Sequence, residues 1–206
     1  MACYIFGAGG FYGLQSQPQQ DDYVIAADGG WAVCQRCGIR PTVLMGDFDS
    51  LQEVPDFPCV KRFPVEKDDT DMMLAIKDAL GRGETEFHLY GGMGGRRTDH
   101  TIANLQALLY LAKHGARGRL YGDGEVYTAL YNGTMTFEAR PSGILSVFCL
   151  GADAEGVSIL GGKYEVADVT LSADFPLGVS NHFVGNPMIV SVKNGCLLIG
   201  SPQGSN

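Results

Sequence analysis

Two short acidic stretches hold the residues best suited to chemistry. They are Gly46-Asp47-Phe48-Asp49-Ser50 and, about twenty positions later, Lys67-Asp68-Asp69-Thr70-Asp71. Two carboxylates aimed at one point repel each other unless a cation lies between them, and Mg²⁺ usually takes one or two carboxylates plus phosphate oxygens. The pattern therefore indicates a magnesium site. A lone Asp-x-Asp is more often a solvated acidic turn, and it is the second acidic stretch that favours the metal.

A predicted strand leads into the first acidic stretch. Residues 42–45 are apolar and partly β-branched, which is typical of a buried strand. Gly46 breaks the run, and alternation along an extended chain places Asp47 and Asp49 on the same side. The sequence alone leaves open which of four carboxylates bind the metal: Asp47, Asp49, Asp68 and Asp71.

The loop 91–100 is a candidate phosphate site, because it contains four glycines and two arginines and leads into a predicted helix. Backbone amides and a helix N-terminus favour an anion, and Arg96 can hold phosphate oxygens. The alternative is a glycine-rich turn with both arginines in solvent. Asp99 fits the first turn of a helix without any further role, and His100 fits a structural role as well as a catalytic one.

Alternating strands and helices are expected to position these loops. Strands are predicted at 3–6, 23–27, 42–45, 59–63, 86–90 and 119–122. Between them, helices are predicted at 31–37, from 70 or 71 to 80, and from the end of the 91–100 loop to about 114. The inward faces are predicted to be Met73, Ile76, Ala79 and Leu80, then Ile102, Leu105, Leu108, Leu109 and Ala112. This order predicts a parallel sheet covered on both faces, with loops 28–30, 46–50 and 91–100 converging at its carboxyl edge.

Another glycine-rich loop, at 7–13, resembles a dinucleotide fingerprint but has Tyr12 where the third glycine belongs. It is a weak signal for backbone that approaches phosphate. A phosphate cradle with paired aspartates predicts a Mg²⁺-nucleotide enzyme. The sequence contains neither a Walker-type phosphate loop nor a protein-kinase signature.

The second half of the chain has a different texture. Its segments are predicted to be strands, at 126–131, 134–139, 144–150, 157–160, 164–171, 188–192 and 196–199. Asn132-Gly133 and Asn194-Gly195 are typical of hairpin turns. We therefore expect two domains, an α/β domain at 1–124 and an antiparallel β-sandwich at 125–206. The second domain contains no carboxylate cluster, so we expect it to serve in binding and assembly rather than in bond chemistry.

Composition excludes several classes of protein. Of 206 residues, 45% are hydrophobic and 18% charged, which is typical of a globular chain with a real core. A net charge of −8 argues against nucleic acid or an anionic membrane as the partner. No apolar run approaches the ~20 residues that span a bilayer, and no secretory signal is expected. Cys34 and Cys37 have the spacing of a redox or zinc pair, but no second pair or nearby histidine completes a zinc set. Structural or incidental thiols in a reducing cytoplasm are therefore expected.

Taken together, the motifs resemble the thiamine pyrophosphokinase family. The resemblance runs in order along essentially the whole chain, and it rests on these residues: Asp28-Gly29-Gly30, Gly46 to Ser50, Lys67-Asp68-x-Thr70-Asp71, Gly91-Gly92-x-Gly94-Gly95-Arg96-x-x-Asp99-His100 and Ser180-Asn181. It implies a three-layer Rossmann-like α/β ATP-binding domain followed by a β-sandwich. It also implies a homodimer that transfers the pyrophosphoryl group of ATP to the thiamine hydroxyl and releases AMP.

The resemblance also implies roles for particular residues. Asp47, Asp49, Asp68 and Asp71 would supply the Mg²⁺ ligands, one of them, such as Asp71, would instead orient or deprotonate the thiamine hydroxyl, and Asp69 would be a bystander. The ATP-binding residues would be Asp28, Gly29, Gly30, Gly92, Gly94, Gly95, Arg96, Asp99 and His100. Thiamine would lie between the acidic edge of one subunit and Ser180 and Asn181 of its partner. Because the only tryptophan is Trp31, the aromatic platform for thiamine would be Phe183 or a tyrosine.

Three other functions remain open from the sequence. A pterin pyrophosphokinase would share ATP and Mg²⁺ but would need a neutral bicyclic pocket. A nucleotide-binding dehydrogenase would use the first glycine loop and Asp28 and leave the aspartate clusters without a role. A metal- or nucleotide-sensing module would keep the loops without turnover.

Overall fold

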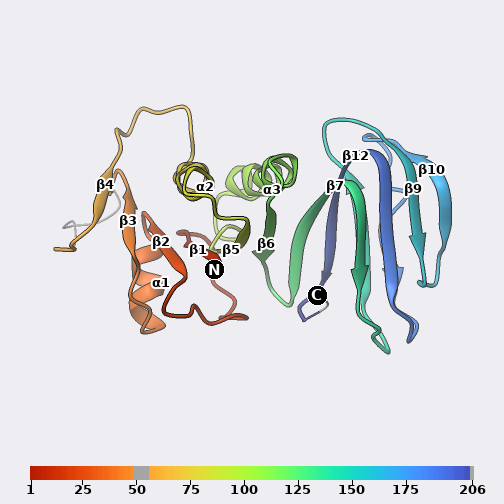
Figure 1. Ribbon diagram of the computed structural model, residues 1–206, viewed down its shortest axis with the longest axis horizontal. Helices are drawn as coiled ribbons and strands as arrows, with labels where there is room; N and C mark the ends of the chain where they lie inside the picture. Colours follow the sequence, from red (N-terminus) through yellow and green to blue (C-terminus); the bar gives the residue numbers. More distant parts are fainter. Residues whose placement is uncertain (49–55, 205–206) are drawn as a thin grey trace. The chain divides into compact units, whose positions relative to one another are not determined.

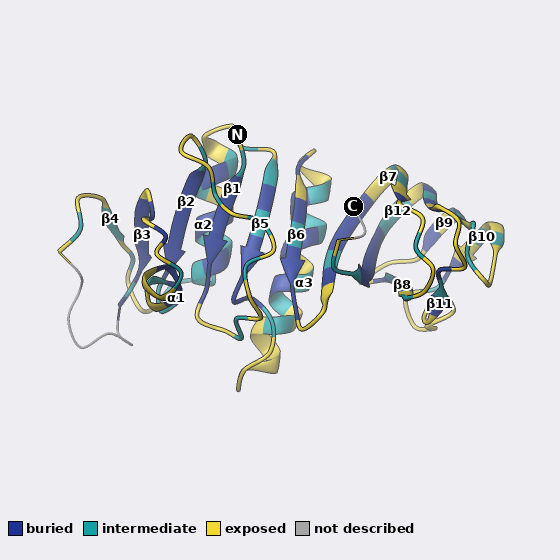
Figure 2. Ribbon diagram, turned by 90° about the horizontal axis from the view of Figure 1, so that it is seen from below, coloured by how far each residue is buried: buried dark blue, intermediate teal, exposed yellow. Residues whose placement is uncertain are grey.

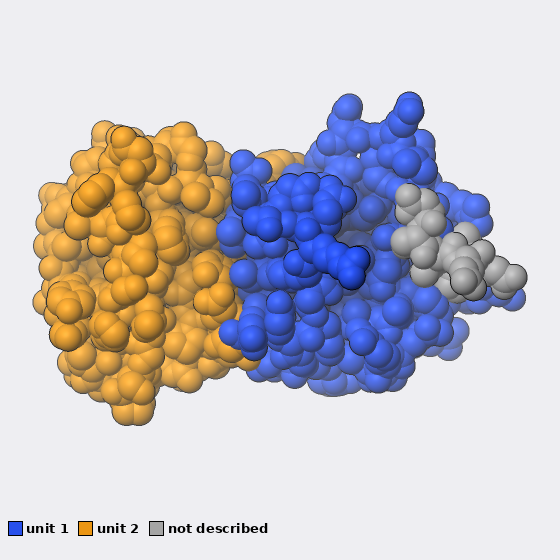
Figure 3. Space-filling view, turned by 180° about the vertical axis from the view of Figure 1, so that it is seen from behind, with its two compact units in different colours: residues 1–107, 116–123 blue, residues 108–115, 124–206 orange. Residues whose placement is uncertain are grey.

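The computed structural model describes residues 1–48 and 56–204, which divide into two compact units (Figure 3). The first unit contains residues 1–107 and 116–123, and the second contains residues 108–115 and those from 124 onward. The predicted metal ligand Asp49 lies outside the described residues.

The first unit is built on a parallel sheet, as the alternating pattern predicted. Its strands lie in the order β6-β5-β1-β2-β3-β4, and every neighbouring pair is parallel. Their bounds are β1 (Cys3–Phe6), β2 (Tyr23–Ala27), β3 (Val43–Gly46), β4 (Val60–Arg62), β5 (Glu86–Tyr90) and β6 (Arg117–Tyr121). Each strand lies within three residues of its predicted bounds.

Helices cover both faces of this sheet. Helix α1 (Gly30–Arg36) lies on one face, and α2 (Asp71–Gly81) and the start of α3 (Thr98–Lys113) lie on the other (Figure 1). Every residue of β1, β2 and β3 is consequently buried (Figure 2). Strands covered on both sides read as continuous apolar runs, which is the pattern that made them recognisable.

The chain reverses direction across the sheet at β1. It moves outward from β1 through β2, β3 and β4, and then returns to place β5 on the other side of β1. The loops that follow β1 and β5 therefore leave neighbouring strands in opposite directions. In an open α/β sheet this point produces a crevice at the carboxyl ends of the strands.

The predicted inward face of α2 was wrong in part. Its buried residues are Met72, Ala75, Ile76 and Ala79, whereas Met73 and Leu80 are only half-buried. Thr70 caps the helix by accepting a hydrogen bond from the Met73 backbone at 3.1 Å. The cap fixes where the first turn begins, and this turns Met72 toward the sheet.

The predicted face of α3 is displaced around the helix. The buried residues are Asn104, Ala107, Leu108 and Leu111, and Ile102 is 55% exposed. Apolar residues surround much of this helix between 102 and 112, so their spacing does not select one face. The buried face of α3 includes Asn104, whose side chain donates a hydrogen bond to the Gly92 carbonyl.

The second unit is built mainly of antiparallel strands around an apolar core. Strand β12 pairs with β7, β8 and β9, β10 pairs with β9, and β11 pairs with β8. The bounds are β7 (Glu125–Phe137), β8 (Ile144–Cys149), β9 (Ala154–Leu160), β10 (Val166–Leu171), β11 (Asn181–His182) and β12 (Met188–Pro202). The short strand β11 was not predicted.

The two predicted Asn-Gly hairpins are wrong. Residues 125–137 form the single strand β7, and 188–202 form the single strand β12. The Asn-Gly pairs instead lie opposite each other, where the register shifts between Val192 and Cys196. The Gly195 amide donates to the Asn132 side-chain oxygen at 2.9 Å. Backbone with positive φ serves a β-bulge as well as a hairpin, and here it bends two long paired strands.

Candidate phosphate-binding and catalytic site

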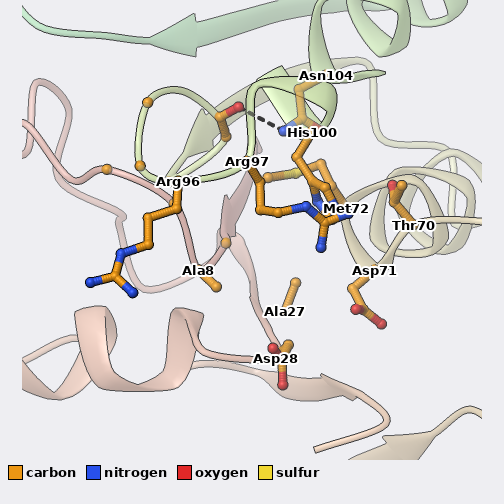
Figure 4. A pocket seen from close by; sticks show the side chains of 17 residues that line it. Ala8, Ala27, Asp28, Thr70, Asp71, Met72, Arg96, Arg97, His100 and Asn104 are labelled. Carbon is orange, nitrogen blue, oxygen red and sulfur yellow. Dashed lines mark hydrogen bonds between the residues drawn. The ribbon is translucent and has the colours of Figure 1, made fainter. Parts of the chain in front are cut away.

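A cavity of about 580 Å³ opens at the carboxyl edge of the first unit's sheet. It lies beside the loops that follow β1 and β5, and residues from the end of β2 and the start of α2 complete its walls (Figure 4). Its lining residues are Gly7, Ala8, Gly9, Gly10, Ala27, Asp28, Thr70, Asp71, Met72, Gly91, Gly92, Gly94, Gly95, Arg96, Arg97, His100 and Asn104.

Two glycine loops interlock to form one wall of the cavity. The Gly9 amide donates to the Gly91 carbonyl and the Gly10 amide donates to the Met93 carbonyl, both at 2.8 Å. A Cβ atom on Gly91 would lie 2.2 Å from the Gly7 carbonyl oxygen, and Gly91 has a φ of +66°. Backbone packs directly on backbone here, so the 7–13 loop, only a weak signal in the sequence, belongs to the site.

Replacing Gly91 with alanine is expected to destabilise the protein by roughly 3 kcal/mol or more and to weaken nucleotide binding. The added methyl group meets the Gly7 carbonyl and also strains the positive φ. Gly83→Ala is the matched control, because Gly83 has a φ of +88° but no atom within 4 Å of an added Cβ. The control is expected to lose about 1 kcal/mol. Urea unfolding checks both values, and equal losses would contradict the interlocked loops.

Asn104 holds the second glycine loop in place. Its side-chain amide donates to the Gly92 carbonyl at 2.7 Å, and the residue is 94% buried (Figure 4). A methyl group on Gly92 would approach both Leu120 and this amide. Sequence reasoning missed Asn104; the available signal was one asparagine within the apolar part of a helix.

The ends of β2 and β3 meet on the acidic side of the cavity. The Asp28 amide donates to the Met45 carbonyl at 2.7 Å, and Asp28 has a φ of +47°. Gly46 approaches so closely that an added Cβ would lie 3.2 Å from the Asp28 backbone. This non-glycine residue with positive φ places its carboxylate in the cavity wall, next to the chain that carries Asp47. Figure 4 shows Asp28 and Asp71 below the arginine-bearing loop.

A lysine lies between two of the predicted metal ligands. The Lys67 ammonium donates to Asp47 Oδ2 at 2.9 Å and to Asp71 Oδ1 at 2.8 Å. The side chains of Lys67 and Asp47 are each 13% exposed. Burial alone would lower the pKa of Lys67, but these hydrogen bonds raise it above its usual value. Among the described residues, the cation between these carboxylates is thus the ammonium of Lys67, for which sequence reasoning predicted no role.

The other acidic residues lie away from this pair. Asp68 is exposed and does not line the cavity. Asp69 forms an ion pair with Lys77 at 2.7 Å and does not line the cavity, and its bystander role stays a prediction. Within residues 1–48 and 56–204, no three His, Cys, Asp or Glu side chains gather as a metal site.

The two arginines of the glycine loop differ in their partners. Arg97 donates to both carboxylate oxygens of Asp99, and this lowers the pKa of Asp99 to about 2. Asp99 is exposed and lies in the first turn of α3, outside the cavity lining. Arg96 lines the cavity, extends in a different direction from Arg97 (Figure 4), and forms no ion pair with any described residue. Arg96 is therefore available to an anionic ligand.

Gly29 and Gly30 lie behind the cavity wall. A Cβ on Gly30 would lie 1.8 Å from the Phe6 carbonyl oxygen, and one on Gly29 would lie 2.9 Å from Ala8. These glycines let α1 approach β1 and so support the 7–10 loop. Farther along α1, Cys34 is buried and Cys37 half-buried, and both are free thiols.

The predicted thiamine residues belong to the second unit, where they have structural contacts. The Asn181 side chain accepts from the Tyr164 and His182 amides and donates to the Tyr164 carbonyl. Phe183 is 97% buried in the second unit's core. Ser180 is exposed, with a φ of +62° and its amide donating to the Ser146 hydroxyl at 3.1 Å. Of the three, Ser180 alone is available at the surface, and the thiamine assignment stays a prediction.

The fold and this cavity define a doubly wound α/β protein whose site suits a phosphate-bearing ligand. Residues 14–119 match the thiamin pyrophosphokinase catalytic domain, and residues 134–197 match the thiamin pyrophosphokinase vitamin B1 binding domain. The chain belongs to the thiamin pyrophosphokinase family. The pterin pyrophosphokinase and dehydrogenase alternatives receive no support from these matches.

Several relatives show the same similarity over nearly the full length. A thiamine pyrophosphokinase of Bacillus subtilis (strain 168) is 26% identical over 182 residues, which is 85% of each chain. The crystal structure of thiamine pyrophosphokinase from Bacillus subtilis superimposes with a TM-score of 0.87 at 24% identity, covering 99% of this chain and 100% of that one. That of thiamin pyrophosphokinase from Geobacillus thermodenitrificans gives 0.83 at 26% identity, covering 100% and 99%. No helix in the described part of the chain is long and apolar enough to cross a membrane.

Proposed function

We propose that this chain transfers the pyrophosphoryl group of ATP to the hydroxyl of thiamine, giving thiamine diphosphate and AMP. The observation that carries the proposal is a glycine-walled phosphate cavity in which a lining carboxylate, Asp71, is coupled through Lys67 to a second carboxylate, Asp47. Family membership supplies the substrates. In this proposal residues 1–124 form the three-layer Rossmann-like ATP domain, and residues 125–206 form a β-sandwich that binds thiamine.

The residues of the acidic edge fit Mg²⁺. Asp47 and Asp71 are close enough to share one ammonium, and their oxygens are the hard ligands that this ion prefers alongside phosphate. Asp47 and Asp71 would hold the ion, with Asp49 and Asp68 as the other carboxylates the motifs supply. When bound, Mg²⁺ supplies neutralisation of the charge on the ATP phosphates.

Each cavity residue then has a role in positioning. The interlocked glycine loops present backbone to the phosphates, and Arg96 holds their oxygens by charged hydrogen bonds. Asp28 and His100 complete the walls around the nucleotide. Asp71 faces the cavity and accepts the hydrogen bond of the thiamine hydroxyl, which orients it toward the β-phosphorus. The new oxygen–phosphorus bond forms there, Asp71 takes up the hydroxyl proton, and the bond between the β-phosphorus and the oxygen that bridges to the α-phosphorus breaks, so AMP leaves with that oxygen.

Nucleotide products test this reaction directly. With ATP, Mg²⁺ and thiamine, we expect AMP and thiamine diphosphate in equal amounts, because one transfer produces one of each. Chromatography of the reaction measures both, and a reaction without thiamine is the control. Stoichiometric ADP would show transfer of a single phosphoryl group and would reject the proposal.

We also propose that the chain works as a homodimer in which Ser180 of one subunit faces the acidic edge of the other. The segment around Ser180 and the start of the neighbouring strand β8 carry large apolar side chains that are 39–64% exposed, as expected of a protein-binding surface. They are Ile144, Phe175, Leu177, Val179 and Val184. The cationic thiazolium ring of thiamine suits an acidic edge. All six cysteines are free thiols, in keeping with a reducing cytoplasm.

Mixed dimers test the shared site. Asp71→Asn and Ser180→Lys should each be nearly inactive, since one loses the orienting carboxylate and the other repels the cationic substrate. After subunit exchange, the mixture should recover about a quarter of wild-type activity, because half the dimers are mixed and each has one intact site. AMP release measures the recovery. Full wild-type activity in a monomer, measured by light scattering, would contradict the shared site.

A further inference from the structure

Lys67 occupies the position that a metal ion would take between Asp47 and Asp71. Its ammonium lies 2.9 Å from Asp47 Oδ2 and 2.8 Å from Asp71 Oδ1. These two carboxylates come from distant parts of the chain, one after β3 and the other in the first turn of α2. One ammonium therefore joins the two acidic stretches that the sequence contains.

An ammonium and a divalent cation would repel each other between these two carboxylates. The two carboxylates carry −2 and Lys67 carries +1, in a setting where the lysine and Asp47 are each 13% exposed. A metal ion that bridges Asp47 Oδ2 and Asp71 Oδ1 would have to occupy the space between these oxygens, which the Lys67 ammonium now fills. If a metal ion displaces the Lys67 ammonium, that positive charge loses its carboxylate partners in a poorly hydrated place, which costs free energy.

Phosphate provides the missing partner. Asp71 lines the cavity, and so does Thr70 immediately before it, so the ammonium lies at the border of the phosphate region. Lysine carries a compact charge on a flexible four-carbon stem, which allows its head to move between neighbouring anions. When ATP binds, its phosphate oxygens can accept hydrogen bonds from the Lys67 ammonium while Asp47 and Asp71 bind a metal ion.

We propose that Lys67 acts as an exchange cation: it holds Asp47 and Asp71 together in the nucleotide-free protein and releases them to a divalent metal only when phosphate accepts its ammonium. The phosphate half of this exchange rests on the proposed function. Metal binding and nucleotide binding are then coupled through one side chain, and such coupling is reciprocal. Lys67 is a positioning residue in this scheme.

The first test measures metal binding without nucleotide or thiamine. Lys67→Met keeps the stem and removes the charge, so we expect the variant to bind Mn²⁺ alone at least about tenfold more tightly than wild type. Electron paramagnetic resonance of free Mn²⁺ gives the affinity. Lys77→Met is the matched control, because it removes the same charge from an ion pair with Asp69 that involves neither Asp47 nor Asp71. The control should bind Mn²⁺ as wild type does, and Lys67→Arg, which keeps the charge, should also bind it weakly.

Folding provides a second measurement on the same proteins. Metal-free Lys67→Met should melt below Lys77→Met, since Asp47 and Asp71 are left to repel each other, and Mn²⁺ should restore much of the loss. Affinity for Mn²⁺ equal to that of the control would overturn the proposal. A variant that fails to fold even with Mn²⁺ would overturn it too, because the ammonium would then not be replaceable by a metal ion.

The phosphate half is tested with ATP in the presence of a chelator. Wild type should bind metal-free ATP about tenfold more tightly than Lys67→Met, and Lys77→Met should match wild type. Equal affinity of the three proteins for metal-free ATP would show that the Lys67 ammonium does not move to phosphate. These measurements do not depend on turnover. If Lys67→Met binds Mn²⁺ more tightly but wild type forms no AMP, the exchange role of Lys67 stands and the proposed function is rejected. If wild type forms AMP but Lys67→Met binds Mn²⁺ no more tightly, the proposed function stands and the exchange role is rejected.

Discussion

Replacing Asp71 with asparagine is expected to reduce AMP formation by about a hundredfold to ten-thousandfold. Asp71 is the carboxylate that both lines the cavity and shares Lys67 with Asp47. Asparagine keeps the size of the side chain but can neither accept the proton of the thiamine hydroxyl nor bind a metal ion as well. Steady-state assays of AMP release measure the loss.

Asp69→Asn is the matched control, because Asp69 lies two positions away and pairs with Lys77 outside the cavity. It should keep near wild-type activity. Thermal melts add a second measurement: Mg²⁺-ATP should stabilise wild type by roughly 2.7 kcal/mol at a hundred times the dissociation constant, and the Asp71→Asn protein much less. If Asp71→Asn responds to Mg²⁺-ATP as wild type does, the acidic edge is not part of the nucleotide site.

Replacing Arg96 with alanine should lower kcat/KM by roughly ten- to a hundredfold, equivalent to about 1.5–3 kcal/mol for a charged hydrogen bond to phosphate. Arg96 lines the cavity and has no ion-pair partner among the described residues, so its guanidinium is available to ATP. Removing it leaves phosphate charge without a partner in the transition state. Kinetics at varied ATP concentration measure the effect.

Arg97→Ala is the natural comparison, because Arg97 is adjacent in sequence and is held by both oxygens of Asp99. Its loss should be clearly smaller, since the interaction removed is an exposed ion pair. If the two variants have the same kinetics, the glycine loop does not present Arg96 to the phosphates as proposed.

Local sequence patterns gave wrong predictions where the structure depends on contacts between segments that are distant in sequence. Asn132-Gly133 has the backbone freedom of a hairpin, but it lies opposite Gly195 on β12 and forms a bulge there. The face of α3 was misplaced because Leu105 and Leu109 recur at helical spacing just as the buried Leu108 and Leu111 do. Periodicity reports how apolar residues recur along a helix, while packing in the folded protein decides which of them are buried.

Phe183 shows the same limit for a functional residue. The sequence offered it as an aromatic platform because the chain has a single tryptophan. In the fold it belongs to the second unit's core, and Ser180, three positions earlier, is the exposed residue. A short polar stretch beside an aromatic residue does not by itself reveal which of them faces solvent.

The sequence by itself determined the order of strands and helices in the first unit and the loops that carry its chemistry. It could do so because buried parallel strands are short apolar runs, and because ligands bind where such strands end. Only the tertiary structure decided how those loops meet. It packed the weak 7–13 signal against Gly91 and brought Lys67 between two carboxylates that are 24 positions apart in sequence. Such contacts depend on strand order across the sheet, and no spacing along the chain encodes the distance between side chains that only the folded sheet brings together.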